Sequence, residues 1–190
     1  MKEGLIKDAY ELIIKEIQTA ITAGYIFAIG IGMLFNYQKY SEFDINIFAY
    51  SDVFDFLIAP FSDFYILFFA TASIAFVSIL IKLDNLWKEK RPVSYAKWNF
   101  GDDSKSWFKA YRIVAITITF ILYIYISADY YGKNAKNRIL EQDDISIRME
   151  DNEIRSGKLI GKTKDVIFLL RDENVYALPI NTSVKEIRIK

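Results

Sequence analysis

The sequence predicts an α-helical integral membrane protein that ends in a small all-β domain. Three observations support this fold class. The chain is unusually apolar, with 53% hydrophobic residues among 190, whereas average chains are about 45–50% apolar even with glycine included. Three long segments carry no charged residue. After these segments, from Ile145 onward, apolar and polar residues alternate with the period of a β-strand.

The composition excludes several kinds of site. The chain has no cysteine and no histidine, which removes disulfides, thiolate chemistry and the commonest zinc ligand and general base. Lys+Arg and Asp+Glu are balanced at 24 each, so we expect no nucleic-acid partner. No phosphate-binding loop or nucleophile motif occurs, and we predict a protein without catalytic residues, metal or cofactor.

The charge-free segments predict three membrane spans. A spanning helix needs about 20 residues, and the first two segments, Ile17–Gln38 and Phe64–Ile81, meet this length. The third, Ile113–Ala128, is shorter, but Lys109 and Arg112 can snorkel and extend it. The expected spans are residues 17–38, 64–81 and 109–129. Residues 1–16 place apolar side chains at helical spacing, which predicts an amphipathic lead-in continuous with the first span.

Basic residues predict the orientation of these spans. The loop between the second and third spans holds eight Lys and Arg residues, whereas residues 39–63 hold one lysine and five acids. Short basic loops stay in the cytoplasm. We therefore expect the N-terminus and this loop on the cytoplasmic side of the cell (inner) membrane, and the C-terminal domain on its outer side. The tryptophans all lie in the basic loop and are candidate interfacial anchors: Trp87, Trp98 and Trp107.

Residues 45–61 form an aromatic and apolar passage that is interrupted by acids. Ser51 and Asp52 predict a helix start, because a short polar side chain caps a helix and an acid favours its first turn. Asp52 and Asp55 would then share one helix face. The segment is a re-entrant helix that places carboxylates at the mouth of a cation pathway, an interfacial helix, or a fourth span. Asp52 and Asp55 are the candidate ion or partner contacts.

A row of small residues recurs at every fourth position of the first span: Ala20, Gly24, Ala28 and Gly32. This spacing gives one helix face a smooth ridge, where another backbone can approach closely. The partner is either a second copy of the chain or the second span, where Thr71 and Ala75 offer a matching stripe. Since three helices bury little among themselves, we expect a homo-oligomer embedded in membrane lipid.

Residues 133–144 are polar and predict a linker or a helical stub. Residues 145–190 predict about five short strands, with a tight connection at 172–174 and a turn at 181–183. About 46 residues suffice for a small SH3- or Sm-like barrel, which is marginal in size and would gain from association with other copies. Its charges alternate in sign, as on a solvated surface.

Within this tail, a glycine-led strand, a threonine and a proline-containing strand end follow one another as Gly157 or Gly161, Thr163 and residues 179–181. In this order they resemble the small β domain of the mechanosensitive channels of small conductance, over about thirty residues. The resemblance implies a similar shape for the tail. It departs in two ways: that family keeps the domain in the cytoplasm, and its last span is rich in Gly and Ala, whereas here only Ala115 and Ala128 are of that kind.

The whole chain resembles small multi-pass bacterial membrane proteins with a short β tail, some of which act in anti-phage defence. We therefore expect a non-enzymatic, homo-oligomeric pore, membrane-perturbing effector or membrane subunit of a larger system. The alternative is a membrane-anchored scaffold or sensor, in which an exposed strand edge of the β tail docks a protein partner.

Overall fold

The computed structural model describes residues 2–101 and 105–188. Its helical elements are α1 (Lys2–Ser41), the 3-10 turn η1 (Ile47–Ala49), α2 (Val53–Ser62), α3 (Phe64–Lys90), α4 (Pro92–Trp98), α5 (Phe108–Glu141) and α6 (Ile180–Ser183). Its strands are β1 (Ile145–Met149), β2 (Ile154–Lys162), β3 (Val166–Arg171), β4 (Asn174–Pro179) and β5 (Val184–Arg188). Three helices, α1, α3 and α5, are long and apolar enough to cross a membrane.

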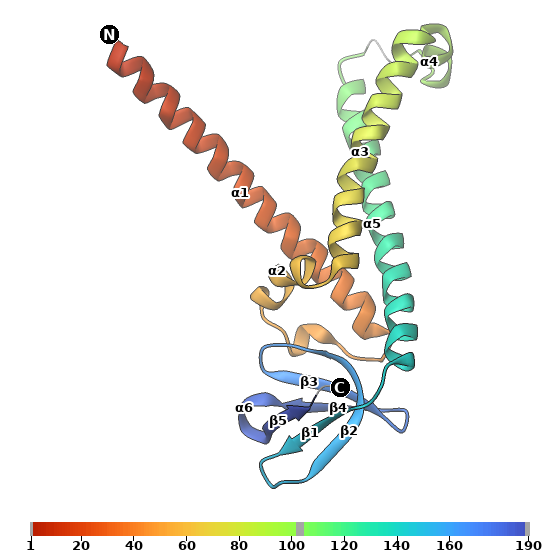
Figure 1. Cartoon of the computed structure of the whole chain (residues 1–190). Helices are drawn as coiled ribbons and strands as arrows, with labels where there is room; N and C mark the ends of the chain where they lie inside the picture. The colour runs from red at the N-terminus through yellow and green to blue at the C-terminus, as the bar shows by residue number, and fades with distance from the viewer. Residues whose placement is uncertain (1, 102–104, 189–190) are drawn as a thin grey trace.

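The three long helices meet at the end that carries the β domain. Figure 1 shows α3 and α5 running side by side, with α4 at their far end, whereas α1 joins them near the β domain and then diverges. Every described side chain from Lys15 to Ile26 in α1 is exposed. The basic residues around α4 and the β domain therefore lie at opposite ends of α5, as the expected third span requires.

The helical core forms where these three helices converge. Its buried members come from α1, α2, α3 and α5: Ile31, Phe35, Ala59, Ile66, Ala70, Ile124, Ala128, Tyr131 and Ala135. Phe35 is fully buried, and its ring centroid lies 5.9 Å from that of Phe69 and 5.4 Å from that of Tyr131. Gly132 lets α5 approach α1 closely, because a Cβ atom there would lie 2.7 Å from the backbone oxygen of Gln38.

The β domain is an antiparallel five-stranded sheet with the order β4-β3-β2-β1-β5. The tight connection between β3 and β4 consists of Asp172 and Glu173, which have positive φ angles of 49° and 64°. Positive φ at both central residues is the backbone that a two-residue type I′ hairpin turn requires. One face of the sheet buries its own core around Ile147, Ile167 and Leu169. The other face packs Phe168 against the helices.

The five strands and the tight connection at 172–174 confirm the prediction from alternation. The 10 residues of α2 extend over about 15 Å, half of a hydrocarbon core of roughly 30 Å, so α2 is too short to be a fourth span. Residues 133–141 continue α5 as a helix, and only residues 142–144 connect it to β1. Helix α1 is continuous from Lys2, while the side chains of residues 1–14 lie outside the described part.

Candidate functional site

The β domain is docked on the helices by aromatic contacts. Tyr40, near the end of α1, is buried and places its ring 5.4 Å from that of Phe168 in β3. Gly161 in β2 makes room for this contact, because a Cβ atom there would lie 2.3 Å from the hydroxyl oxygen of Tyr40. Ile139 of α5 and Ile160 of β2 belong to the same buried cluster. The tail thus shares a buried cluster with the helices and is not merely tethered to them.

Polar contacts secure the same junction. The Lys158 ammonium of β2 donates hydrogen bonds to the backbone oxygens of Leu140 and Gln142, at 2.5 and 2.8 Å. A lysine at this position satisfies carbonyls that the end of α5 leaves unpaired and complements the helix dipole. On the α1 side, Lys136 of α5 donates to the backbone oxygen of Glu42 at 2.7 Å. The end of α5 is therefore held from two directions.

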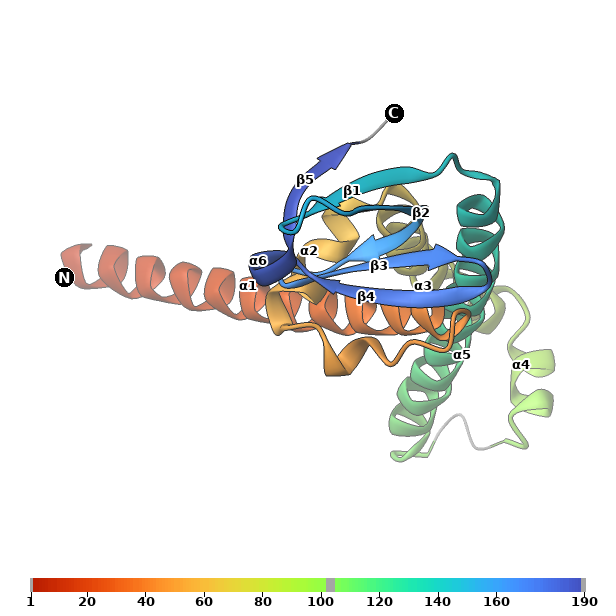
Figure 2. The same cartoon turned by 90° about the horizontal axis from the view of Figure 1, so that it is seen from below.

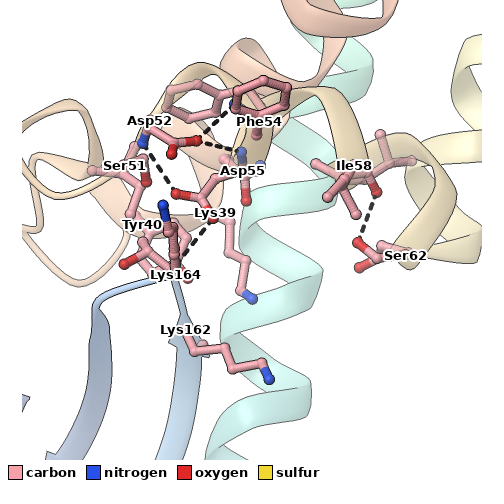
Figure 3. A pocket seen from close by; sticks show the side chains of 18 of the residues that line it. Lys39, Tyr40, Ser51, Asp52, Phe54, Asp55, Ile58, Ser62, Lys162 and Lys164 are labelled. Atoms are coloured by element: carbon pink, nitrogen blue, oxygen red, sulfur yellow. Dashed lines mark hydrogen bonds between the residues drawn. The ribbon is translucent and has the colours of Figure 1, made fainter. Parts of the chain in front are cut away.

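A cavity of about 760 Å³ lies where the end of α1, α2 and the β2–β3 turn come together. Figure 3 shows the residues around it, with the turn reaching toward the first residues of α2. Charged side chains from all these elements line the cavity: Lys39, Asp52, Asp55, Asp63, Lys162 and Lys164. The cavity therefore brings together groups that are more than a hundred residues apart in the chain.

The two acids singled out in the sequence both line this cavity, and the structure gives them structural partners. Asp52 is the N-cap of α2, where its Oδ1 accepts hydrogen bonds from the backbone N–H groups of Phe54 and Asp55. Asp55 completes a capping box by accepting from the backbone N–H of Asp52. Its Oδ1 also accepts from the backbone N–H of Lys164 at 3.1 Å (Figure 3). Asp55 thus connects α2 to the β domain.

Asp63 is the third acid of the cavity and joins two of the long helices. Its Oδ1 accepts from the backbone N–H of Tyr65 and caps α3, while its Oδ2 accepts from the hydroxyl of Tyr131 in α5 at 2.7 Å. All three carboxylates therefore have hydrogen-bond donors of the protein. In the described part of the chain, no three acids gather closely enough to share a metal ion.

The ridge of small residues in α1 is divided between two environments. Gly32 is buried against α2, and a Cβ atom there would lie 1.9 Å from the backbone oxygen of Phe56. Ala28 is half-buried, whereas Ala20 and Gly24 are exposed and nothing lies within 4 Å of a Cβ at Gly24. Thr71 and Ala75 on α3 are exposed as well. Within one copy, the ridge therefore meets α2 at Gly32 and does not meet the expected stripe on the second span.

The three tryptophans gather at the end of the helices opposite the β domain. Trp87 of α3 and Trp98 of α4 have ring centroids 6.4 Å apart, and Trp87 also meets the buried Tyr95 at 5.4 Å. Trp107 precedes α5 and stays half-exposed. The structure brings them to one level of the helical bundle, which is compatible with the predicted role as interfacial anchors.

The β sheet has two open edges. Among the described residues, β4 and β5 each pair with one strand only, and Figure 2 shows them at opposite edges of the sheet. Tyr176 of β4 pairs with the buried Leu169, and Ile187 of β5 pairs with the buried Ile147. Both side chains therefore lie on the inner face of the sheet, which is the face that buries the core of the β domain itself. They nevertheless remain 45% and 40% exposed.

No protein-family model and no curated protein matches this chain. A solved structure described as the 1.55 Å crystal structure of the pleiotropic translational regulator Hfq is similar to 30% of this chain and to 93% of that chain, with 12% sequence identity and a TM-score of 0.24. A similarity of this size carries no argument about fold or function.

Sequence reasoning missed the lysines of the cavity and the residues that dock the β domain. Lys39 carried a signal, because it is the single basic residue between the first two charge-free segments. Gly161 was noted as a glycine of the β tail, but nothing in the sequence indicated its contact with Tyr40, because that contact depends on how two distant elements pack.

Proposed function

We propose that the chain is a subunit of a non-enzymatic, homo-oligomeric membrane protein that opens a pathway through the bilayer. In this proposal α1, α3 and α5 cross the cell (inner) membrane, with the N-terminus and the basic loop in the cytoplasm and the β domain outside. The β domain is a small SH3- or Sm-like barrel that remains open in a single copy. Its edges are completed by neighbouring subunits.

The observation that carries the proposal is the pair of open edges. A strand edge with unpaired backbone groups is a template for another strand, and β4 and β5 are different edges of one sheet. Pairing β4 of one copy with β5 of the next is a head-to-tail contact, which closes into a ring when the rotation permits. Such pairing would also bury Tyr176 and Ile187, the half-exposed members of the inner face.

The rigid junction would transmit this arrangement to the membrane. Only residues 142–144 separate α5 from β1, and Lys158 holds the last carbonyls of the helix. A ring of β domains would therefore place one α5 per subunit around a common axis. The exposed half of α1 would then lie in lipid or against an adjacent copy.

Cysteine cross-linking tests the assembly directly, because the chain has no native cysteine. We expect oxidation of the double variant Tyr176→Cys/Ile187→Cys in membranes to give a ladder of covalent multimers. Each single variant should give none. The matched control, Tyr176→Cys/Asp151→Cys, places the second thiol on the exposed β1–β2 turn and should stay monomeric. Equal ladders from the control pair would rule out the edge contact.

Ion flux into liposomes tests the pathway separately. Lysines on both edges, in Tyr176→Lys/Ile187→Lys, should prevent strand pairing by repulsion and abolish flux together with the multimers. Multimers of the unaltered chain that conduct no ions would refute the pore and favour the scaffold, in which an open edge accepts a strand of a protein partner. Asp52→Asn and Asp55→Asn are poor probes of conduction, because both carboxylates hold α2 in place.

A further inference from the structure

We propose that the cavity between the end of α1, α2 and the β2–β3 turn binds the phosphodiester headgroup of an anionic phospholipid, through Lys39, Lys162 and Lys164. This inference does not depend on the proposed pore. The proposed ligand would bind where charged groups meet at the level expected for a membrane surface. The volume of the cavity, about 760 Å³, is within the usual range of about 300–1,000 Å³ for a small-molecule site.

The acidic and basic side chains of the cavity differ in their hydrogen-bond partners. The carboxylates of Asp52, Asp55 and Asp63 all accept hydrogen bonds from backbone N–H groups, and Asp63 also accepts from a tyrosine hydroxyl. The ammonium groups of the three lysines form no hydrogen bond or ion pair within residues 2–101 and 105–188, although Lys39 lies 5.2 Å from the centre of its neighbour Tyr40. The cavity therefore presents cationic donors without matching acceptors.

These lysines come from two sides of the cavity. Lys39 is half-buried near the end of α1, whereas Lys162, the last residue of β2, and Lys164, in the β2–β3 turn, are exposed. In Figure 3 the side chains of Lys39 and Lys162 extend toward the same side of the cavity. The turn is fixed in place by the hydrogen bond from the backbone N–H of Lys164 to Asp55. Asp63 acts on the half-buried Lys39 ammonium only through electrostatic attraction, without a hydrogen bond or ion pair. An anion that bridges the two sides would supply the hydrogen-bond acceptors that this ammonium group lacks.

The position of the cavity favours a lipid as the source of this anion. Lys39 directly follows the charge-free run 17–38, and Asp63 directly precedes the run 64–81. The cavity therefore lies where both predicted spans leave the hydrocarbon. Helix α2 forms one wall and exposes an apolar surface beside it, with Phe54 and Phe61 exposed by 70% and 72%. Exposed rings of this kind enter the acyl region while basic groups hold the headgroups.

Native mass spectrometry of the purified full chain in detergent tests the site. The chain is titrated with phosphatidylglycerol and, in parallel, with phosphatidylcholine that has the same acyl chains. We expect phosphatidylglycerol to bind on the order of a hundredfold more tightly, since each of the three lysines near an anionic lipid favours it by about fivefold and these factors multiply. Equal binding of the two lipids would overturn the proposal.

The variant Lys162→Gln/Lys164→Gln changes two exposed side chains, at the end of β2 and in the β2–β3 turn. We expect it to fold as the unaltered chain does and to lose most of this preference. Lys162→Arg/Lys164→Arg should keep it. The matched control Lys88→Gln/Lys90→Gln removes two exposed charges at the opposite end of α3 and should bind as the unaltered chain. An equal loss in this control, or no loss in the turn variant, would show that the preference does not come from the cavity.

Inorganic phosphate separates a lipid site from a site for a free phosphate. We expect millimolar phosphate to leave the bound phosphatidylglycerol in place, because the acyl chains beside α2 contribute to binding. Displacement of the lipid by phosphate at equal concentration would overturn the assignment to a lipid.

Discussion

The two halves of α1 belong to one continuous helix, but their surroundings are opposite. From Phe27 onward the helix packs against α5, α3 and α2, and Phe35 is fully buried. From Lys15 to Ile26 every side chain is exposed. The ridge of small residues crosses this boundary, so Gly32 is used by α2 while Gly24 contacts nothing. One motif can therefore serve packing within the chain at one end and leave a surface for lipid or another copy at the other.

The largest expected difference between the halves is at these glycines. Gly32→Ala would place a methyl group 1.9 Å from the backbone oxygen of Phe56, so α2 must move, which should cost about 3 kcal/mol, the upper end of the range for overpacking. Gly24→Ala meets nothing and should be neutral or stabilising by up to about 1 kcal/mol. Denaturation of the full chain in mixed detergent micelles, followed by circular dichroism, measures both. Equal losses would contradict the division of the ridge.

A second pair compares aromatic residues in the two halves. Phe35→Ala removes a ring that meets Phe69 and Tyr131. We expect a loss of about 2 kcal/mol, less than the roughly 3–5 kcal/mol of water-soluble cores, because lipid is as apolar as the protein interior and only packing is lost. Tyr25→Ala, at a 53% exposed position, should change the unfolding free energy little. The same denaturation experiment applies, and a larger loss for Tyr25→Ala would mean that a neighbouring copy covers this half.

The smallest expected effect on the unfolding free energy comes from α2, the helix that packs against the half of α1 from Phe27 onward. Asp52→Ala removes the N-cap that binds two backbone N–H groups and should destabilise the chain by about 1 kcal/mol. Asp52→Asn removes the charge but keeps a capping oxygen, so its stability should stay within a few tenths of a kcal/mol of the unaltered chain. A comparison of the three unfolding midpoints decides between capping and charge. If Asn destabilises as much as Ala, the carboxylate charge is what matters.

The sequence by itself predicted the three long helices, the start of α2 and the five strands in their order, but not the short helices α4 and α6. Charge-free runs predicted α1, α3 and the apolar part of α5, because a charged side chain is costly in hydrocarbon. Alternation marked the five strands, because neighbouring side chains of a strand point to opposite faces. The Ser51-Asp52 start of α2 was also visible, since N-caps are chosen locally. For the polar residues after 132, the sequence did not decide between a linker and a helix. They form the end of α5, and Lys158 of a distant strand stabilises this end by hydrogen bonds to its backbone oxygens.

Only the tertiary structure decided which elements meet. The bond between Asp55 and Lys164 spans 109 positions of the chain, and the contact of Tyr40 with Gly161 is similarly remote. Periodicity and capping report the local geometry of a residue, and they are silent on which distant segment faces it. The lysine cavity, the docking of the β domain and the division of the α1 ridge all follow from such meetings. They therefore depend on how the whole chain packs.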